Sequence, residues 1–128
     1  ASNPALEGYS PVSYFEEREP ERGSAEFSSR YNGELYYFTD AQQKMKFERN
    51  PDNYAPQFPH NCPYNLAMGR EVAIDPTNFK IVNGQLLLFH KSAEQDGRKR
   101  WNKAVSEDDI TEAELMERAR NNLLDIRF

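Results

Sequence analysis

Short runs of apolar residues flank two Asn-Gly pairs in the chain. The first run covers residues 27–38 around Asn32-Gly33, and the second covers residues 79–89 around Asn83-Gly84. Asn-Gly favours the two-residue type I′ turn, because both central residues of that turn have φ > 0. The pattern therefore predicts two β-hairpins. Residues 35–38 are apolar at four successive positions, which indicates a strand that is covered on both faces.

Each predicted hairpin is followed by a capping-box pattern, in which a hydroxyl residue stands three positions before a glutamine. The pattern occurs at residues 39–42 and 92–95 and predicts that a helix begins after each hairpin. A third box at residues 111–114 predicts a C-terminal helix with a narrow apolar stripe of Leu115, Met116, Ala119 and Leu123. We expect this helix to dock on its own domain, and binding to a partner is the less favoured alternative.

These elements predict an α+β fold, with a small antiparallel sheet built from the two Asn-Gly hairpins, short packed helices and a C-terminal helix. Residues 1–103 hold 13 basic and 14 acidic residues, whereas residues 104–128 hold 3 basic and 7 acidic residues. The charge distribution therefore predicts a nearly neutral domain over residues 1–103 and an acidic helical extension over residues 104–128. We expect the domain to fold without the extension.

The composition excludes several classes of protein. The 128 residues carry a net charge of −5, which argues against a nucleic-acid module, because such a module needs a basic face. No apolar run approaches the ~20 residues of a membrane-spanning helix. The single cysteine, Cys62, excludes an internal disulfide and a site of several thiolates. The chain is thus expected to be a soluble, acidic domain; it begins at Ala1 with no apolar signal core, so the sequence leaves its compartment open.

Three segments form an ordered series of motifs: residues 8–15 (GYSPVSYF), 31–38 (YNGELYYF) and 47–58 (FERNPDNYAPQF). The series resembles the YHS domain family, and in particular its single-domain branch of often exported bacterial proteins. The resemblance covers residues 4–103 and leaves the acidic tail outside. It implies a non-enzymatic binding module for a metal ion or a small ligand, and it favours an exported or periplasmic location over a cytoplasmic one.

The resemblance also bears on metal binding. YHS domains occur in copper-transporting ATPases and in hydroxylase components, and they are related to small domains that bind metals through cysteines. In those relatives one cysteine follows the Tyr-Tyr-Phe strand and a second comes four residues later. Here these positions hold Thr39 and Gln43, whose oxygens are poor substitutes for thiolates on a soft metal. We therefore expect the cysteine-type metal site to be absent.

A different metal site remains as a hypothesis, with His60, Cys62 and His90 as ligands of copper or zinc. Three further residues could complete its shell: Tyr64, Met68 and Asp75. The hypothesis requires His90, at the end of the second hairpin, to meet the Pro-rich segment in space. The alternative is a buried, inert Cys62 and a surface His60. We predict no catalytic residue, because Cys62 has no resolving cysteine and no evident orienting group.

The many tyrosines suggest a ligand-binding site, for which the candidates are Tyr37 and Tyr64. Aromatic residues in strands commonly fill the core, but a buried tyrosine hydroxyl must find a partner, so a cluster can line a polar pocket. The function predicted from the sequence is a YHS-type binding module. The alternatives are a structural or interaction domain whose acidic tail engages an unidentified protein, and an accessory component of an oxidoreductase.

Overall fold

The structure is a computed structural model that describes residues 4–58 and 60–127. The first part of the chain holds the 3-10 helix η1 (Ala5–Gly8), α1 (Ser13–Glu16), β1 (Ser24–Tyr31), β2 (Glu34–Phe38), α2 (Ala41–Arg49) and α3 (Pro51–Tyr54). The second part holds α4 (Pro63–Ala67), β3 (Phe79–Val82), β4 (Gln85–Leu88), α5 (Gly97–Glu107) and α6 (Glu112–Arg127). The predicted α+β class is confirmed.

Both Asn-Gly pairs form the predicted turns. The φ angles are 51° at Asn32 and 82° at Gly33, and 51° at Asn83 and 76° at Gly84. This is the conformation of the type I′ hairpin turn. However, the prediction of one sheet is wrong, because β1 pairs with β2 and β3 pairs with β4 in two separate antiparallel sheets. The outer edge of β4 is occupied by the segment after α3, whose Gln57 amide donates to the carbonyl of Leu86 at 3.0 Å.

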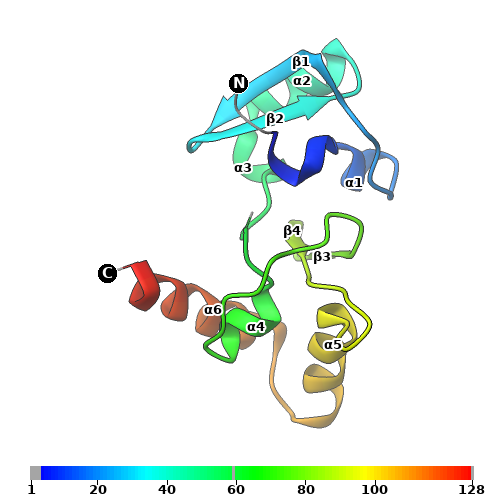
Figure 1. Cartoon of the computed structure of the whole chain (residues 1–128). Helices are drawn as coiled ribbons and strands as arrows, with labels where there is room; N and C mark the ends of the chain where they lie inside the picture. The colour runs from blue at the N-terminus through cyan, green and yellow to red at the C-terminus, as the bar shows by residue number, and fades with distance from the viewer. Residues whose placement is uncertain (1–3, 59, 128) are drawn as a thin grey trace.

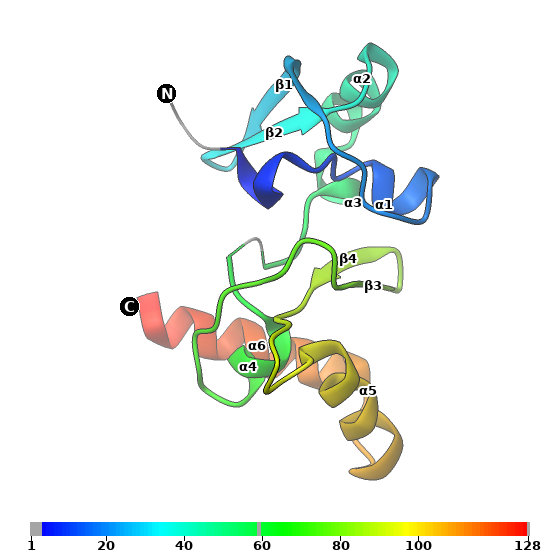
Figure 2. The same ribbon diagram turned by 45° about the vertical axis from the view of Figure 1, so that its right-hand side comes forward.

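The β3–β4 hairpin lies between two halves of the molecule (Figures 1 and 2). The first half contains η1 and the elements from α1 to α3, and the second contains α4, α5 and α6. In β4 and the residue after it, Leu86 and Leu88 belong to the apolar core of the first half, while Leu87 and Phe89 belong to that of the second. All four side chains are fully buried. This run of four apolar residues therefore joins the two cores.

The helices that follow the hairpins begin one or more residues later than predicted. Asp40, not Thr39, caps α2, and its carboxylate accepts a hydrogen bond from the Gln43 amide at 2.8 Å. The side chain of Gln43 accepts from the amide of Thr39, the residue before the N-cap, at 3.1 Å, so the arrangement resembles a capping box whose cap is displaced by one residue. Asp96 caps α5, whereas Ser92 accepts a hydrogen bond within a turn that precedes this helix. An aspartate next to the hydroxyl residue accounts for the displacement of the first box, since both are good N-caps.

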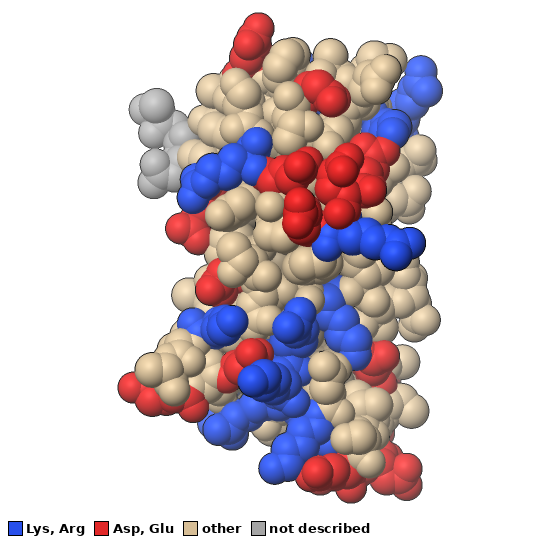
Figure 3. Space-filling model, turned by 90° about the vertical axis from the view of Figure 1, so that its right-hand side faces the viewer, with Lys and Arg blue, Asp and Glu red and all other residues tan. Residues whose placement is uncertain are grey.

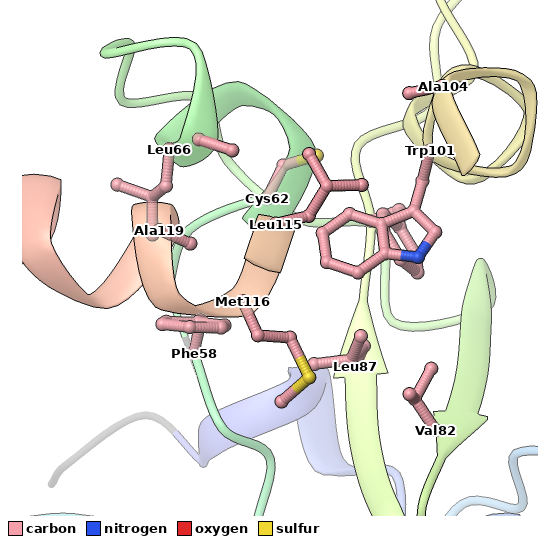
Figure 4. Close-up of a cluster of buried hydrophobic side chains, with 12 residues drawn as sticks. Phe58, Cys62, Leu66, Val82, Leu87, Trp101, Ala104, Leu115, Met116 and Ala119 are labelled. Carbon is pink, nitrogen blue, oxygen red and sulfur yellow. The ribbon is translucent and has the colours of Figure 1, made fainter. Parts of the chain in front are cut away.

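The third capping box is confirmed, because the Thr111 hydroxyl accepts from the Glu114 amide at 3.1 Å. The helix that follows, α6, docks on its own domain as expected, mainly against α4. Its side chains Leu115, Met116 and Ala119 are buried in the core of the second half, beside Trp101 (Figure 4). The boundary expected between residues 103 and 104 lies inside α5, so the structure has no break in its elements at that point.

Glu112 ties three elements together at the start of α6. Its carboxylate accepts from the Trp101 indole of α5 at 3.0 Å and from the Lys80 ammonium of β3 at 2.6 Å. Burial opposes the ionisation of this carboxyl, but the hydrogen bonds from Lys80 and Trp101 outweigh it and hold the pKa of Glu112 below its usual value. The ionised side chain therefore stabilises the fold.

We expect Glu112→Gln to lower the free energy of unfolding by about 1–2 kcal/mol at pH 7, because the charged hydrogen bonds are lost. A carboxyl with a depressed pKa contributes its stability above its unfolded-state pKa, near 4.5, and loses it as the pH falls through the lower folded-state value. The difference between wild type and variant should therefore shrink below pH 4.5. Urea unfolding at several pH values measures it, with Glu117→Gln on the exposed face of α6 as the control. A pH-independent difference would contradict this role for Glu112.

Candidate functional site

The three predicted metal ligands lie in different environments. Cys62 is fully buried at the start of α4, where Leu66, Leu115 and Trp101 lie around it (Figure 4). His60 is exposed and pairs with the carboxylate of Glu34. The Nδ1 atom of His90 lies 2.9 Å from the carbonyl oxygen of Ala73.

The structure does not gather these three ligands into one centre. Among the described residues, no group of three or more His, Cys, Asp or Glu side chains could hold a metal ion. The physical reason is that the chain turns Cys62 into the core while His60, two residues earlier, faces solvent. A site built from all three side chains is therefore not formed. Of the residues proposed to complete the shell, Met68 is exposed and Asp75 accepts hydrogen bonds from Thr77 in a local turn.

The two predicted ligand-binding tyrosines also lie apart. Tyr37 is half-buried on β2, in the first half of the molecule, where it packs near Gly8. Tyr64 is half-buried on α4, in the second half, and lines an open cleft of about 580 Å³ beside Lys99, Arg100 and Lys103 of α5. The two side chains therefore do not contribute to a common pocket.

A different cleft is the better candidate for a binding site. It has a volume of about 520 Å³ and is open to solvent between the first hairpin and α6. Its walls come from the β1–β2 hairpin, from α3 and the segment after it, and from single residues of β4 and α6. We call it the hairpin cleft, and its lining residues are Tyr31, Asn32, Glu34, Tyr36, Asp52, Ala55, Pro56, Gln57, His60, Gln85 and Leu123.

Strand periodicity places three of these side chains on one face of the hairpin. Tyr31 is paired with Glu34 across the turn, and Tyr36 follows Glu34 by two positions. Cross-strand partners and residues two apart in a strand share a face, so all three project to the same side. Tyr37 projects to the opposite side. The alternation of the strand could thus have shown, from the sequence alone, that Tyr36 and not Tyr37 shares a face with Tyr31 and Glu34.

Polar contacts join the walls of the hairpin cleft. The Tyr31 hydroxyl donates to the Asp52 carboxylate, which connects the hairpin to α3. The pair of Glu34 and His60 connects the hairpin to the segment before α4. Glu34 and Asp52 thus place one carboxylate on each of two walls. The cleft is lined by these negative charges and by aromatic rings.

Tyr36 is the distinctive residue of the hairpin cleft. Only 2% of the residue is exposed, and its ring packs on that of Phe47 with 5.2 Å between the centroids. Within the described part of the chain its hydroxyl has no hydrogen-bond partner. No fully buried side-chain nitrogen or oxygen of the described residues lacks a partner, so this hydroxyl must reach the open cleft. Burial, followed by the nearby charges of Glu34 and Tyr31, raises the pKa of Tyr36, so the group is a neutral donor at pH 7.

Comparisons with known proteins add no further assignment. No protein-family model matches the sequence, and neither the curated proteins nor the solved structures gave a significant match. The likeness to YHS domains therefore rests on the motifs of residues 4–103. None of the helices in the described ranges is long and apolar enough to cross a bilayer.

Proposed function

We propose that the protein is a non-enzymatic binding module of the YHS type, which holds a small polar ligand in the hairpin cleft. The observation that supports this proposal is the Tyr36 hydroxyl, which lies at the cleft and has no hydrogen-bond partner among the described residues. Because this hydroxyl reaches the open cleft, a ligand bound there can accept its hydrogen bond in place of water. The volume of about 520 Å³ is within the usual range for small-ligand pockets.

The lining residues define the chemistry of the ligand. Glu34 and Asp52 accept hydrogen bonds and attract positive charge, while Tyr36 supplies a neutral donor. The rings of Tyr31 and Tyr36, together with Leu123, provide an apolar surface beside these polar groups. The best match is a small molecule with hydroxyl or amino groups next to a short hydrocarbon part.

The alternative of an acidic tail that engages a protein has less support. The apolar stripe of α6, which would be the natural contact for a partner, is occupied by the protein's own core. Among the residues of α6 whose burial is described, Leu124 is the large apolar side chain that stays exposed. The tail therefore offers mainly charged side chains to a partner.

The test is a titration of the ¹⁵N-labelled protein with glucose, ethanolamine and choline, followed by NMR shifts of backbone amides. At least one probe should shift amides of the hairpin cleft, and Tyr36→Phe should weaken that binding about 5–10-fold, as expected for one lost hydrogen bond of about 1 kcal/mol. If no probe shifts the cleft amides, or if Tyr36→Phe binds equally well, the proposal fails.

A matched pair of variants controls for folding. Tyr36→Phe should leave the free energy of unfolding unchanged or raise it slightly, because it removes a hydroxyl that has no partner. Tyr14→Phe should lower it by about 1–2 kcal/mol, because the buried Tyr14 hydroxyl donates to the carbonyl of Pro76 at 2.6 Å. Urea unfolding of both variants gives the comparison. A large loss in Tyr36→Phe would indicate a structural role for its hydroxyl.

A further inference from the structure

One face of the molecule carries charges of opposite sign on its two halves. Figure 3 shows acidic side chains over the half that holds α1 and the loop after it, and basic side chains over the half that holds α5. We define the acidic patch by the exposed residues Glu17 and Glu19 and the basic patch by the exposed residues Lys99, Arg100 and Lys103. The chain is acidic overall, so the basic patch is a local feature.

The basic patch is unfavourable for its own helix. Lys99 and Arg100 lie in the first turn of α5, at the positive end of the helix dipole, where cations destabilise a helix. Neither has an acidic side-chain partner among the described residues, and Lys103 reaches only Glu107, at 3.9 Å. Glu17 and Glu19 likewise have no basic side-chain partner in the described ranges. Within the described residues, Glu17, Glu19, Lys99 and Arg100 thus have no side-chain partner of opposite charge.

The tip of the β3–β4 hairpin lies between the two patches. In Figures 1 and 2 the hairpin lies between α1 and α5, and its turn points to the right-hand side of the molecule, which faces the viewer in Figure 3. Lys80 and Val82 direct their backbone groups to β4, so those of Ile81 point outward from the unpaired edge of β3. The Ile81 amide and carbonyl have no partner within the described residues, and 36% of the residue is exposed. The face therefore has an apolar centre with open hydrogen-bonding groups.

We propose that this face is a self-complementary docking surface, through which two copies of the chain form an antiparallel dimer with two-fold symmetry. A two-fold axis in the plane of the face places the acidic patch of each copy over the basic patch of the other. The interface would then hold two equivalent contacts between an acidic and a basic patch, and the β3 edges of the two copies would meet near the axis. A standard interface needs about 800 Å² from each partner, which is close to a tenth of the 7440 Å² surface of this chain.

The first test is the mass of the protein by sedimentation equilibrium. We expect a dimer at low ionic strength and a shift toward monomer as sodium chloride is raised, because exposed charges are screened by salt. A monomer at every protein and salt concentration would overturn the proposal. A dimer whose affinity is unaffected by salt would also overturn it, since its interface would not depend on these patches.

The second test reverses the charges. Lys99→Glu/Arg100→Glu and Glu17→Lys/Glu19→Lys should each be monomeric, because like charges then oppose each other across the interface. An equimolar mixture of the two variants should restore the dimer, since opposite patches face each other again in the mixed pair. Failure of the mixture to dimerise, or dimers of either variant alone, would contradict the antiparallel arrangement.

Matched controls separate this arrangement from a general effect of charge. Glu117→Lys/Asp125→Lys changes the same number of charges on exposed positions of α6, away from the face in Figure 3, and should leave the dimer unchanged. Loss of the dimer in this control would show that net charge, not the two patches, governs association. All substituted positions are exposed, so circular dichroism should confirm that every variant is folded.

Discussion

Deletion of residues 108–128, which removes α6, is expected to abolish cooperative folding of the protein. The deletion takes the buried side chains of Leu115, Met116 and Ala119 out of the second core and exposes Trp101. Replacing one buried Leu or Met by Ala typically costs about 2–5 kcal/mol, and a domain has only about 5–15 kcal/mol in total. The loss of two such side chains, with the hydrogen bond from Trp101 to Glu112, is therefore comparable to the whole stability of a domain.

Circular dichroism, tryptophan fluorescence and urea unfolding measure this effect. The truncated chain should lose its cooperative transition, and its Trp101 emission should shift toward that of a solvent-exposed indole. Leu124→Ala, at an exposed position of α6, is the control and should leave the transition in place. A truncated chain that unfolds cooperatively would instead support the sequence-based expectation of an independent domain over residues 1–103.

That expectation came from counting charges, and the contacts of α6 with α4 argue for the opposite result. Three acidic residues of α6, Glu114, Glu117 and Asp125, are exposed. The helix packs through the buried residues Leu115, Met116 and Ala119, and the Asn122 amide donates to the carbonyls of Leu66 and Ala67 in α4. Net charge reports the exposed face and contains no information about the buried one. The apolar stripe itself was visible in the sequence, and it correctly predicted that the helix docks on its own domain.

Local signals predicted the hairpins well, because two adjacent residues determine the turn. Asn32-Gly33 and Asn83-Gly84 require only their own backbone conformations, and both adopt them. Whether the two hairpins share a sheet depends instead on what occupies the edge of β4. That edge bonds to Gln57, a residue of the Pro-rich segment, and nothing in the local pattern indicates this contact.

The candidate site was harder to predict from the sequence, because it too depends on tertiary contacts that the local pattern does not indicate. Strand alternation is sufficient to place Tyr31, Glu34 and Tyr36 on one face. The opposite walls come from Asp52 and Leu123, which are distant in the sequence and meet the hairpin only through tertiary packing. The same holds for the proposed metal ligands: His60 and Cys62 are close in sequence, but His60 is exposed whereas Cys62 is buried at the beginning of α4.

Gly97→Ala is expected to lower the free energy of unfolding by about 2–3 kcal/mol through overpacking. A Cβ atom at this position would lie 2.7 Å from the Cys62 sulfur and 3.3 Å from the backbone N and O of His90. Helix propensity alone favours alanine by up to about 1 kcal/mol, and Gly97 has no positive φ angle, so any loss must arise from these contacts. The backbone of His90 cannot move easily, because its carbonyl accepts from the Gly97 amide at 2.8 Å.

A double-mutant cycle with Cys62→Ala identifies the contact. Removal of the sulfur should cost about 1–2 kcal/mol alone, but it vacates the space that the alanine methyl at position 97 needs. The loss in the double variant should therefore be smaller than the sum of the single losses by about 1 kcal/mol or more, as measured by urea unfolding. Gly33→Ala is the control: its Cβ meets no atom within 4 Å, so its loss should reflect only the positive φ and should add to that of Cys62→Ala. Strict additivity for Gly97→Ala and Cys62→Ala would show that the Cys62 sulfur does not pack against the start of α5.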